Sequence, residues 1–240
     1  MQVQVRYRDP DGREREAAPG EMRAVPLERC EPLREPHAYH GRQSILTRYW
    51  AATTKGMVVC GSERLMYAAA LLDFDASVQW FSATATQICW QDGSAHGTVE
   101  PAFFARTVRG ERLVIVHPAR DGDEQARSRE AEVVAHVADA AGWTVAPLDV
   151  PTGIRLQWLR VVSAHRFPDL YDEKIRDVLL PAFSVARPIT AGVAAAGLPR
   201  TALAHAWHLL WTGDLSFERD RALIPVSLAW AGNAANRVVV

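Results

Sequence analysis

Three side chains around one predicted hairpin have the chemistry of metal ligands. The hairpin is predicted from the stretch EPAFFARTVRGERLVIVHP, in which two apolar runs flank a turn at Arg109-Gly110. Glu100 opens the stretch and His117 ends its second run, while Glu63 stands near the start of a predicted helix. Groups from a helix and two strands can converge on a divalent metal. A surface glutamate and a strand-end histidine are the simpler interpretation, which we prefer.

A second pair of candidate ligands lies near the end of the sequence. His205 and His208 are three residues apart, and this spacing places them on one face of a predicted helix. No third ligand follows at a suggestive spacing. Two packed histidines beside Trp207 and Trp211 are therefore the interpretation that we prefer over a metal site. The sequence predicts no resident metal and no cofactor.

Nucleophilic chemistry has little support in the sequence. The glycine-rich phosphate-binding motifs and the G-x-S-x-G and H-E-x-x-H motifs do not occur. The three cysteines, Cys30, Cys60 and Cys89, are far apart and form no C-x-x-C pair, which indicates buried free thiols rather than a zinc site or a disulfide framework.

Composition indicates an ordinary globular protein. The chain has 240 residues, of which 48% are hydrophobic and 23% charged, and its net charge is −1. No apolar run is long enough for a membrane span, and the charged N-terminus lacks the apolar segment of a signal peptide, so we expect a cytoplasmic protein. Residues 151–240 carry a charge of +3 and residues 40–150 a charge of −3.

The side chains above must be positioned by a mixed α/β segment. Residues 1–40 read as an irregular arm with a short hairpin at its start, and residues 41–150 as the α/β domain. Ser62 is a candidate N-cap, and Gly142 a candidate helix stop. The expected elements are a helix over Ser62–Leu72, strands over Ser77–Ser82 and Thr84–Trp90, the hairpin, a helix over Asp123–Ala141 and a strand over Thr144–Val150.

The pattern changes after Pro151. Residues 151–240 predict a helical domain that ends in a hairpin around the charged turn Glu218–Arg221. This order is that of a winged helix-turn-helix. Three packed helices that contact no DNA remain the alternative. The expected helices are Ile154–His165, Asp172–Phe183, Ile189–Ala196 and Thr201–Trp211, and the strands are Asp214–Phe217 and Leu223–Leu228.

Residues from Arg42 to Trp230 resemble the TnsA-like transposase endonuclease family of actinobacterial type. The residues that carry the resemblance are Tyr39-His40-Gly41-Arg42-Gln43, Tyr49-Trp50-Ala51-Ala52-Thr53, Leu72-Asp73-Phe74-Asp75-x-x-Val78, Pro101-x-Phe103-Phe104-Ala105 and His208-Leu209-Leu210-Trp211-x-Gly213-x-Leu215. The resemblance implies a PD-(D/E)xK nuclease core, a mixed sheet with helices, followed by a winged-helix-like module. It also implies a place in transposition.

The chemistry of that family does not carry over to this sequence. Such a nuclease needs a Glu on the first helix, an Asp on the first hairpin strand and an acid-x-Lys on the second. Carboxylates hold Mg²⁺, which activates the attacking water. Leu65, Ala102, Ile115 and His117 stand at these four places. Glu63 is two residues from the helical place, about 200° around the helix, so it faces elsewhere.

The sequence therefore predicts a pseudo-nuclease, with a catalytically degenerate site, that acts by binding DNA, a protein partner such as a transposase subunit, or both. The candidate DNA face is the second helix of the helix-turn-helix and the wing. Its residues are Arg200, Thr201, His205, Arg219 and Arg221.

Two alternatives stay open. One is a protein-interaction scaffold that binds no DNA, in which case an exposed apolar patch is expected instead of a contiguous arginine surface. The other is an active, Mg²⁺-dependent DNA endonuclease with relocated acids, Glu63 among them. A homo-oligomer is compatible with each.

Overall fold

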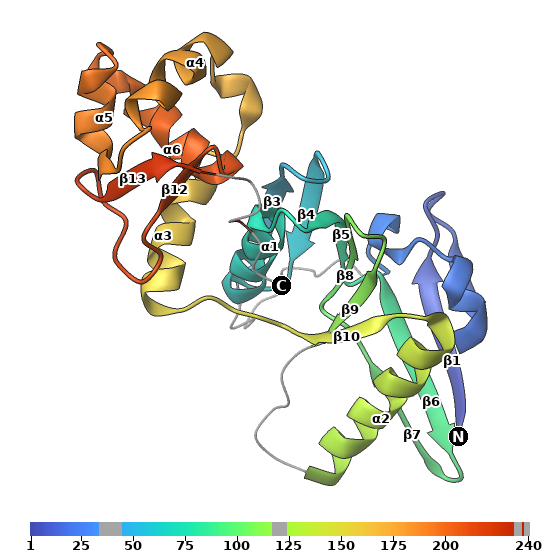
Figure 1. The fold of residues 1–240 in the computed structure, drawn as a ribbon. Helices are drawn as coiled ribbons and strands as arrows, with labels where there is room; N and C mark the ends of the chain where they lie inside the picture. Colours follow the sequence, from blue (N-terminus) through green and yellow to red (C-terminus); the bar gives the residue numbers. More distant parts are fainter. Residues whose placement is uncertain (34–44, 117–123, 233–236, 238–240) are drawn as a thin grey trace. The chain divides into compact units, whose positions relative to one another are not determined.

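A computed structural model describes residues 1–33, 45–116, 124–232 and 237. The chain is mixed α/β, as the sequence predicts, and divides into two compact units (Figure 1). Unit 1 comprises residues 1–49, 57–66 and 78–149, and unit 2 comprises residues 50–56, 67–77 and 150–240. No helix in the described part of the chain is both long enough and apolar enough to cross a bilayer.

The first sheet of unit 1 incorporates the N-terminal segment. Its strand order is β2-β1-β6-β7, with antiparallel neighbours. The strands are β1 (Gln2–Arg8), β2 (Glu14–Ala17), β6 (Thr86–Asp92) and β7 (Ala95–Val99). The expectation of an irregular arm over residues 1–40 does not describe residues 1–33, because β1 pairs with β6 over six residues, from Gln2↔Gln91 to Tyr7↔Thr86.

The second sheet of unit 1 carries the predicted hairpin. Its order is β10-β9-β8-β5, and β10 runs parallel to β9 while the other neighbours are antiparallel. Its strands are β5 (Val78–Ala83), β8 (Phe103–Thr107), β9 (Arg112–Val116) and β10 (Thr144–Pro147). Helix α2 (Glu124–Ala141) makes the crossover from β9 to β10, and Gly142, at φ 68°, ends it as predicted.

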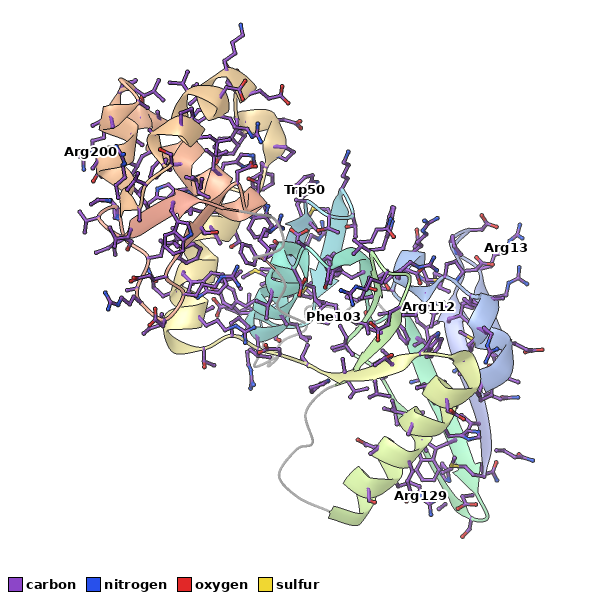
Figure 2. All side chains as sticks on the ribbon, viewed as in Figure 1. Arg13, Trp50, Phe103, Arg112, Arg129 and Arg200 are labelled. Carbon is purple, nitrogen blue, oxygen red and sulfur yellow. The ribbon has the colours of Figure 1, made fainter. Side chains whose placement is uncertain are left out.

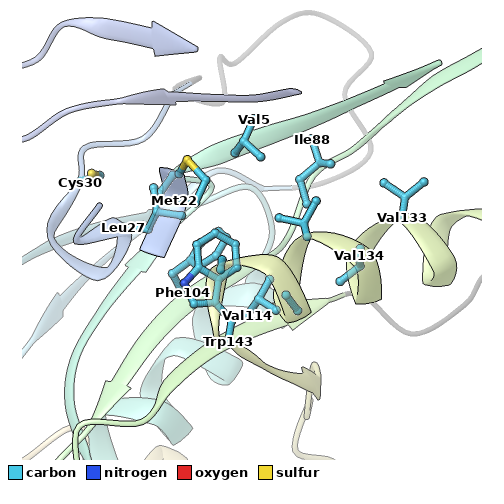
Figure 3. Packing of buried hydrophobic residues seen from close by; sticks show 14 residues of the cluster. Val5, Met22, Leu27, Cys30, Ile88, Phe104, Val114, Val133, Val134 and Trp143 are labelled. Carbon is cyan, nitrogen blue, oxygen red and sulfur yellow. The ribbon is translucent and has the colours of Figure 1, made fainter. Parts of the chain in front are cut away.

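One apolar core joins both sheets, α2 and the N-terminal 3-10 turns η1 (Pro19–Ala24) and η2 (Leu27–Arg29). Figure 3 shows Val5, Ile88, Phe104 and Val134 facing this core. Because α2 presents its apolar stripe of Val133, Val134, Val137 and Ala138 to the sheets, its position is fixed by burial.

The chain passes between the two units through a hairpin and a helix. The hairpin strands are β3 (Thr47–Ala51) and β4 (Gly56–Cys60), and helix α1 spans Glu63–Phe74. Ser62 is the N-cap of α1, since its Oγ accepts a hydrogen bond from Leu65 N at 3.2 Å. This cap was predicted from the sequence.

Unit 2 contains the C-terminal helices and a small sheet. Its elements are α3 (Gly153–Ser163), η3 (Pro168–Leu170), α4 (Glu173–Ala182), β11 (Arg187–Pro188), α5 (Ile189–Ala195), η4 (Arg200–Ala202), α6 (Leu203–Thr212), β12 (Leu215–Phe217) and β13 (Leu228–Ala231). The sheet order is β11-β13-β12, and both pairings are antiparallel.

The hairpin of unit 2 differs from the sequence prediction. A strand was expected over Leu223–Leu228, but β13 begins only at Leu228. Pro225 has no N–H for a sheet ladder, and Ser227 N donates to Ile224 O in a turn. The loop between β12 and β13 is therefore Glu218–Ser227, longer than the predicted charged turn.

Candidate functional site

Two of the four degenerate nuclease positions are neighbours in the sheet of unit 1. Ala102 N donates to Ile115 O at 2.8 Å just before β8, where the strand register sets Phe103, the next residue, opposite Ile115 on β9. Ala102 is 1% exposed and Ile115 is 3% exposed. A divalent cation requires oxygen ligands, and neither methyl nor sec-butyl side chains supply them. These positions serve as core.

Only one of the other two positions, Leu65, lies in the described part of the chain. Leu65 is half-buried in the first turn of α1, and Glu63 is exposed at its first residue. His117 lies outside the described residues. Glu100 accepts a hydrogen bond from Gln87 Nε2 at 2.9 Å. Among the residues that the structure describes, no three His, Cys, Asp or Glu side chains are grouped as metal ligands.

Thr84 is strained and lies beside this pair. Its φ is 47°, in the left-handed region that β-branched residues avoid. Its N–H donates to Ala102 O at 3.1 Å and its carbonyl accepts from Leu33 N at 3.0 Å, which fixes the backbone. Its Oγ1 is buried and has no hydrogen-bond partner among the residues that the structure describes.

Replacing Thr84 with glycine is expected to stabilise the protein by about 1 kcal/mol. The substitution relieves about 1–3 kcal/mol of backbone strain, which exceeds the free-energy cost of the extra conformational entropy that glycine loses on folding. Thermal unfolding should show a rise in Tm of about 2–4 °C. The matched control is Thr98→Gly, on the exposed part of β7, which should lower Tm. A lower Tm for Thr84→Gly would show that Thr84 is not strained.

The acids of the Leu72-Asp73-Phe74-Asp75 motif have structural roles in unit 2. The Asp73 carboxylate, 1% exposed, accepts from Ala52 N at 2.9 Å and Thr53 N at 2.7 Å, and so fixes the tip of the β3–β4 hairpin. Asp75 Oδ1 accepts from Ser77 N at 2.7 Å. The motif therefore organises backbone rather than a metal site.

Phe74 of the same motif is at the centre of the aromatic core of unit 2. Its ring centroid lies 5.4 Å from that of Trp158 and 5.4 Å from that of Trp211. Aromatic pairs at this separation stabilise a core by more than the burial of their surface alone. This packing joins the last turn of α1 to α3 and α6.

The two wing arginines have different environments. Arg219 is half-buried, and its Cζ lies 5.2 Å from the Phe74 ring centroid and 5.7 Å from that of Trp158. Arg221 is exposed and pairs with Glu218 at 3.4 Å. The structure thus presents Arg221 to solvent and packs Arg219 against the aromatic core.

The candidate residues of the second helix are divided in the same way. Arg200 and Thr201 are exposed in η4, and Figure 2 shows Arg200 at the periphery of unit 2. His205, by contrast, is half-buried, and its Nε2 accepts from Asp172 N at 3.3 Å. Most of α6 is buried as the sequence predicts, with Ala206, Trp207, Leu209, Leu210 and Trp211 inside.

A cluster of histidines around Tyr171 covers one side of α6. His165 Nδ1 lies 2.7 Å from the Tyr171 hydroxyl, and His208 Nδ1 lies 2.7 Å from the His165 carbonyl oxygen. The rings of Tyr171 and His208 are parallel, with centroids 4.0 Å apart, and His205 meets Tyr171 edge-on. His205 and His208 thus pack against Tyr171, whereas the sequence predicts packing beside Trp207 and Trp211.

This cluster should make the stability of unit 2 dependent on pH. Burial lowers the pKa of His165 and of His208, and the neighbouring histidine charges lower both further. The His165 carbonyl and Asp214 partly oppose this shift at His208. The unfolded chain, with histidine pKa of about 6.5, then binds protons more readily than the folded chain. Stability is therefore complete above about pH 6.5 and falls as the pH drops below it.

The measurement is Tm by circular dichroism from pH 8 to pH 5. His208→Gln should flatten the decline, whereas His136→Gln, a change at an exposed position of α2, should leave it unchanged. A wild-type Tm that stays constant down to pH 5 would contradict the prediction.

Burial disfavours nucleophilic chemistry at two of the thiols. Burial raises the pKa of Cys30 and of Cys60 to about 12, and the neighbouring Glu28 charge adds to the shift at Cys30. A thiol is nucleophilic as its thiolate, which is negligible for both residues at neutral pH. All three cysteines are free, as predicted.

Four exposed apolar side chains lie in the segments that flank or form the β11–β13 pairing of unit 2. Val226 is 62% exposed and Val185 65%, and Ile224 and Leu228 are also exposed. The residues just before β13 lie beside the start of α5, because Ile189 N donates to Ser227 O and Thr190 N donates to Pro225 O. The set Val185, Ile224, Val226 and Leu228 is called the wing patch below.

No family model matches the chain, and no curated protein matches it.

Proposed function

We propose that this protein is a TnsA-like pseudo-nuclease that does not cut DNA and acts by binding. The observation that carries the proposal is the burial of Ala102 and Ile115, two residues joined by a backbone hydrogen bond, at positions where such a nuclease needs carboxylates. Carboxylates there would hold the metal that activates water. The residues present can only pack.

The order of elements along residues 63–147 supports the family part of the proposal. A helix, three strands, a helix and a fourth strand are found as α1, β5, β8, β9, α2 and β10, with the inserted hairpin β6–β7. The four strands lie in the order β10-β9-β8-β5, and β10 pairs in parallel with β9. A mixed sheet of this kind is what the resemblance implies for a PD-(D/E)xK core.

The order of elements in unit 2 supports a DNA-linked role. Strand β11 is followed by the helices α5 and α6 and then by the hairpin β12–β13, with β11 paired to β13. This order agrees with the winged helix-turn-helix that the sequence predicts. Phosphate contacts would come from Arg200 and Arg221, with Thr201 at the helix start facing base edges. Arg219 and His205 would instead maintain the module.

A gel-shift titration on duplex DNA tests this role. We expect Kd on the order of 10⁻⁴–10⁻⁶ M that weakens as salt is raised, because few phosphates are neutralised. Arg200→Ala with Arg221→Ala should weaken binding to all sequences about equally and reduce the salt dependence. Glu63→Ala should not alter binding. A failure of the wild-type protein to shift DNA at low salt would contradict DNA binding.

The wing patch favours protein docking as the second candidate function. Apolar side chains on an exposed surface indicate a contact with another protein. The partner can be a transposase subunit or a second copy of this chain. Analytical ultracentrifugation distinguishes self-association, which Val226→Asp should abolish. If the wild-type protein is a monomer, and if Val226→Asp does not change its affinity for DNA, the wing patch does not have this role.

A further inference from the structure

Unit 2 contains a partly open cavity of about 300 Å³ that none of the functions above uses. It lies where the last turn of α1, the end of α6 and the strands β12 and β13 meet. This volume is at the lower end of the range for small-molecule sites. The cavity is lined by Phe74, Leu210, Gly213, Leu215, Ser216, Phe217, Arg219, Trp230 and Arg237.

The two arginines of the lining are held in place by the protein. Arg237 donates to Phe74 O at 2.8 Å and to Thr212 O at 3.1 Å, and its Cζ lies 5.1 Å from the Phe74 ring centroid. The Cζ of Arg219 lies 5.2 Å from the centroid of the same ring. Both guanidinium groups are thus ordered against one aromatic side chain before any ligand arrives, and this lowers the entropy that binding costs.

The charges around the cavity favour an anion. Burial lowers the pKa of Arg219 and of Arg237, and the charge of Arg155 acts on Arg219 in the same direction. Asp73 and Asp75 offset part of this positive charge. Asp214 contributes less, because it already pairs with Arg176 at 3.0 Å. Arg219 and Arg237 nevertheless repel each other, and an anion bound between two guanidinium groups in a desolvated place would relieve that repulsion.

The remaining lining is apolar and aromatic. Leu210, Leu215 and Phe217 are buried, whereas Trp230 is half-buried and keeps part of its ring accessible. Ser216 adds a hydroxyl group. A ligand that fits must therefore combine an anionic group with a flat body that packs on aromatic rings.

We propose that this cavity binds a nucleotide, with its phosphate on Arg219 and Arg237 and its base against Trp230 and Phe217. A guanidinium fork suits a phosphate, and stacking on aromatic rings accommodates any base. The nucleotide can be free or can be the 5′-phosphorylated end of a DNA strand. The site is independent of DNA contacts through Arg200 and Arg221, since neither residue lines the cavity.

Isothermal titration calorimetry on the full chain tests the site with dAMP, deoxyadenosine and inorganic phosphate. We expect dAMP to bind with one site per chain, at least tenfold more tightly than either fragment. Arg219→Gln should weaken dAMP binding at least tenfold. The matched control is Lys174→Gln, which removes one exposed positive charge from α4 of the same unit and should not change binding.

A second variant keeps the test decisive if Arg219→Gln does not fold, which circular dichroism would show. Trp230→Ala removes the partly exposed ring and leaves both arginines, so it should weaken dAMP binding but not phosphate binding. Absence of dAMP binding to the wild-type protein would overturn the proposal. So would equal dAMP affinity in the wild-type protein and a folded Arg219→Gln or Trp230→Ala variant.

Competition distinguishes the two sources of nucleotide. Displacement of dAMP by a 5′-phosphorylated single strand, at tenfold lower concentration than by its 5′-hydroxyl counterpart, assigns the cavity to DNA ends. Displacement by neither strand assigns it to free nucleotides. The outcome is separable from the gel shift above, because that experiment depends on Arg200 and Arg221.

Discussion

Replacing Gly192 with alanine is expected to lower the stability of unit 2 by about 3 kcal/mol or more. An ideal Cβ at this position of α5 would lie 2.1 Å from Cζ and 2.4 Å from Cε1 of Phe183. Phe183 is fully buried at the end of α4, so its ring cannot move without displacing other core residues. Overpacking of a dense core costs about 1–3 kcal/mol and occasionally more.

Thermal unfolding followed by circular dichroism measures this effect, with an expected fall in Tm of about 6–12 °C. Gly20→Ala is the matched control, because a Cβ there meets no atom within 4 Å. Phe183→Leu in the Gly192→Ala background should recover part of the loss. A Gly192→Ala protein that melts like the wild type would show that α4 and α5 do not pack as described.

Replacing Asp73 with alanine should be about as destabilising, at about 3 kcal/mol. The change leaves the N–H groups of Ala52 and Thr53 without their carboxylate acceptor. A buried donor without a partner costs about 1–3 kcal/mol, and hydrogen bonds to charged groups are at the upper end. The β3–β4 hairpin should therefore lose its fixed tip.

Urea unfolding of Asp73→Ala, compared with Asp169→Ala at an exposed position in η3, measures this cost. The second change should alter stability by less than about 0.5 kcal/mol. If Asp73→Ala retained wild-type stability but lost DNA binding or a cleavage activity, the motif would have a chemical role and the structural one assigned to it would be wrong.

Local signals in the sequence were sufficient for most helices and turns. Ser62 caps α1, Asp172 caps α4 by accepting from Lys174 N, and Gly142 ends α2. Each of these is a short-range interaction that the residue type itself favours. The hairpin at the start of the N-terminal segment was also predicted, and β1 pairs with β2 as expected. Its place in a larger sheet was not predicted, because β1 is held by β6, as in the hydrogen bond from the Thr86 hydroxyl to Arg6 O across 80 residues.

Sequence patterns could not predict where individual side chains of unit 2 point. The wing position of Arg219 suggested a phosphate contact, yet its neighbours are Phe74 and Trp158, which come from distant parts of the chain. His205 likewise accepts a hydrogen bond from the backbone N–H of Asp172, which is 33 residues away in the sequence. Ala102 and Ile115 could be placed from the sequence, because an antiparallel hairpin with a turn at Gly110 brings their positions together.

A cleavage assay on supercoiled and linear DNA, with Mg²⁺ or Mn²⁺ across a salt series, tests the central claim most directly. The account predicts no metal-dependent nicking by the wild-type protein, because buried Ala102 and Ile115 supply no ligand. Metal-dependent nicking that Glu63→Ala abolishes would contradict it and would identify this chain as an endonuclease with relocated acids.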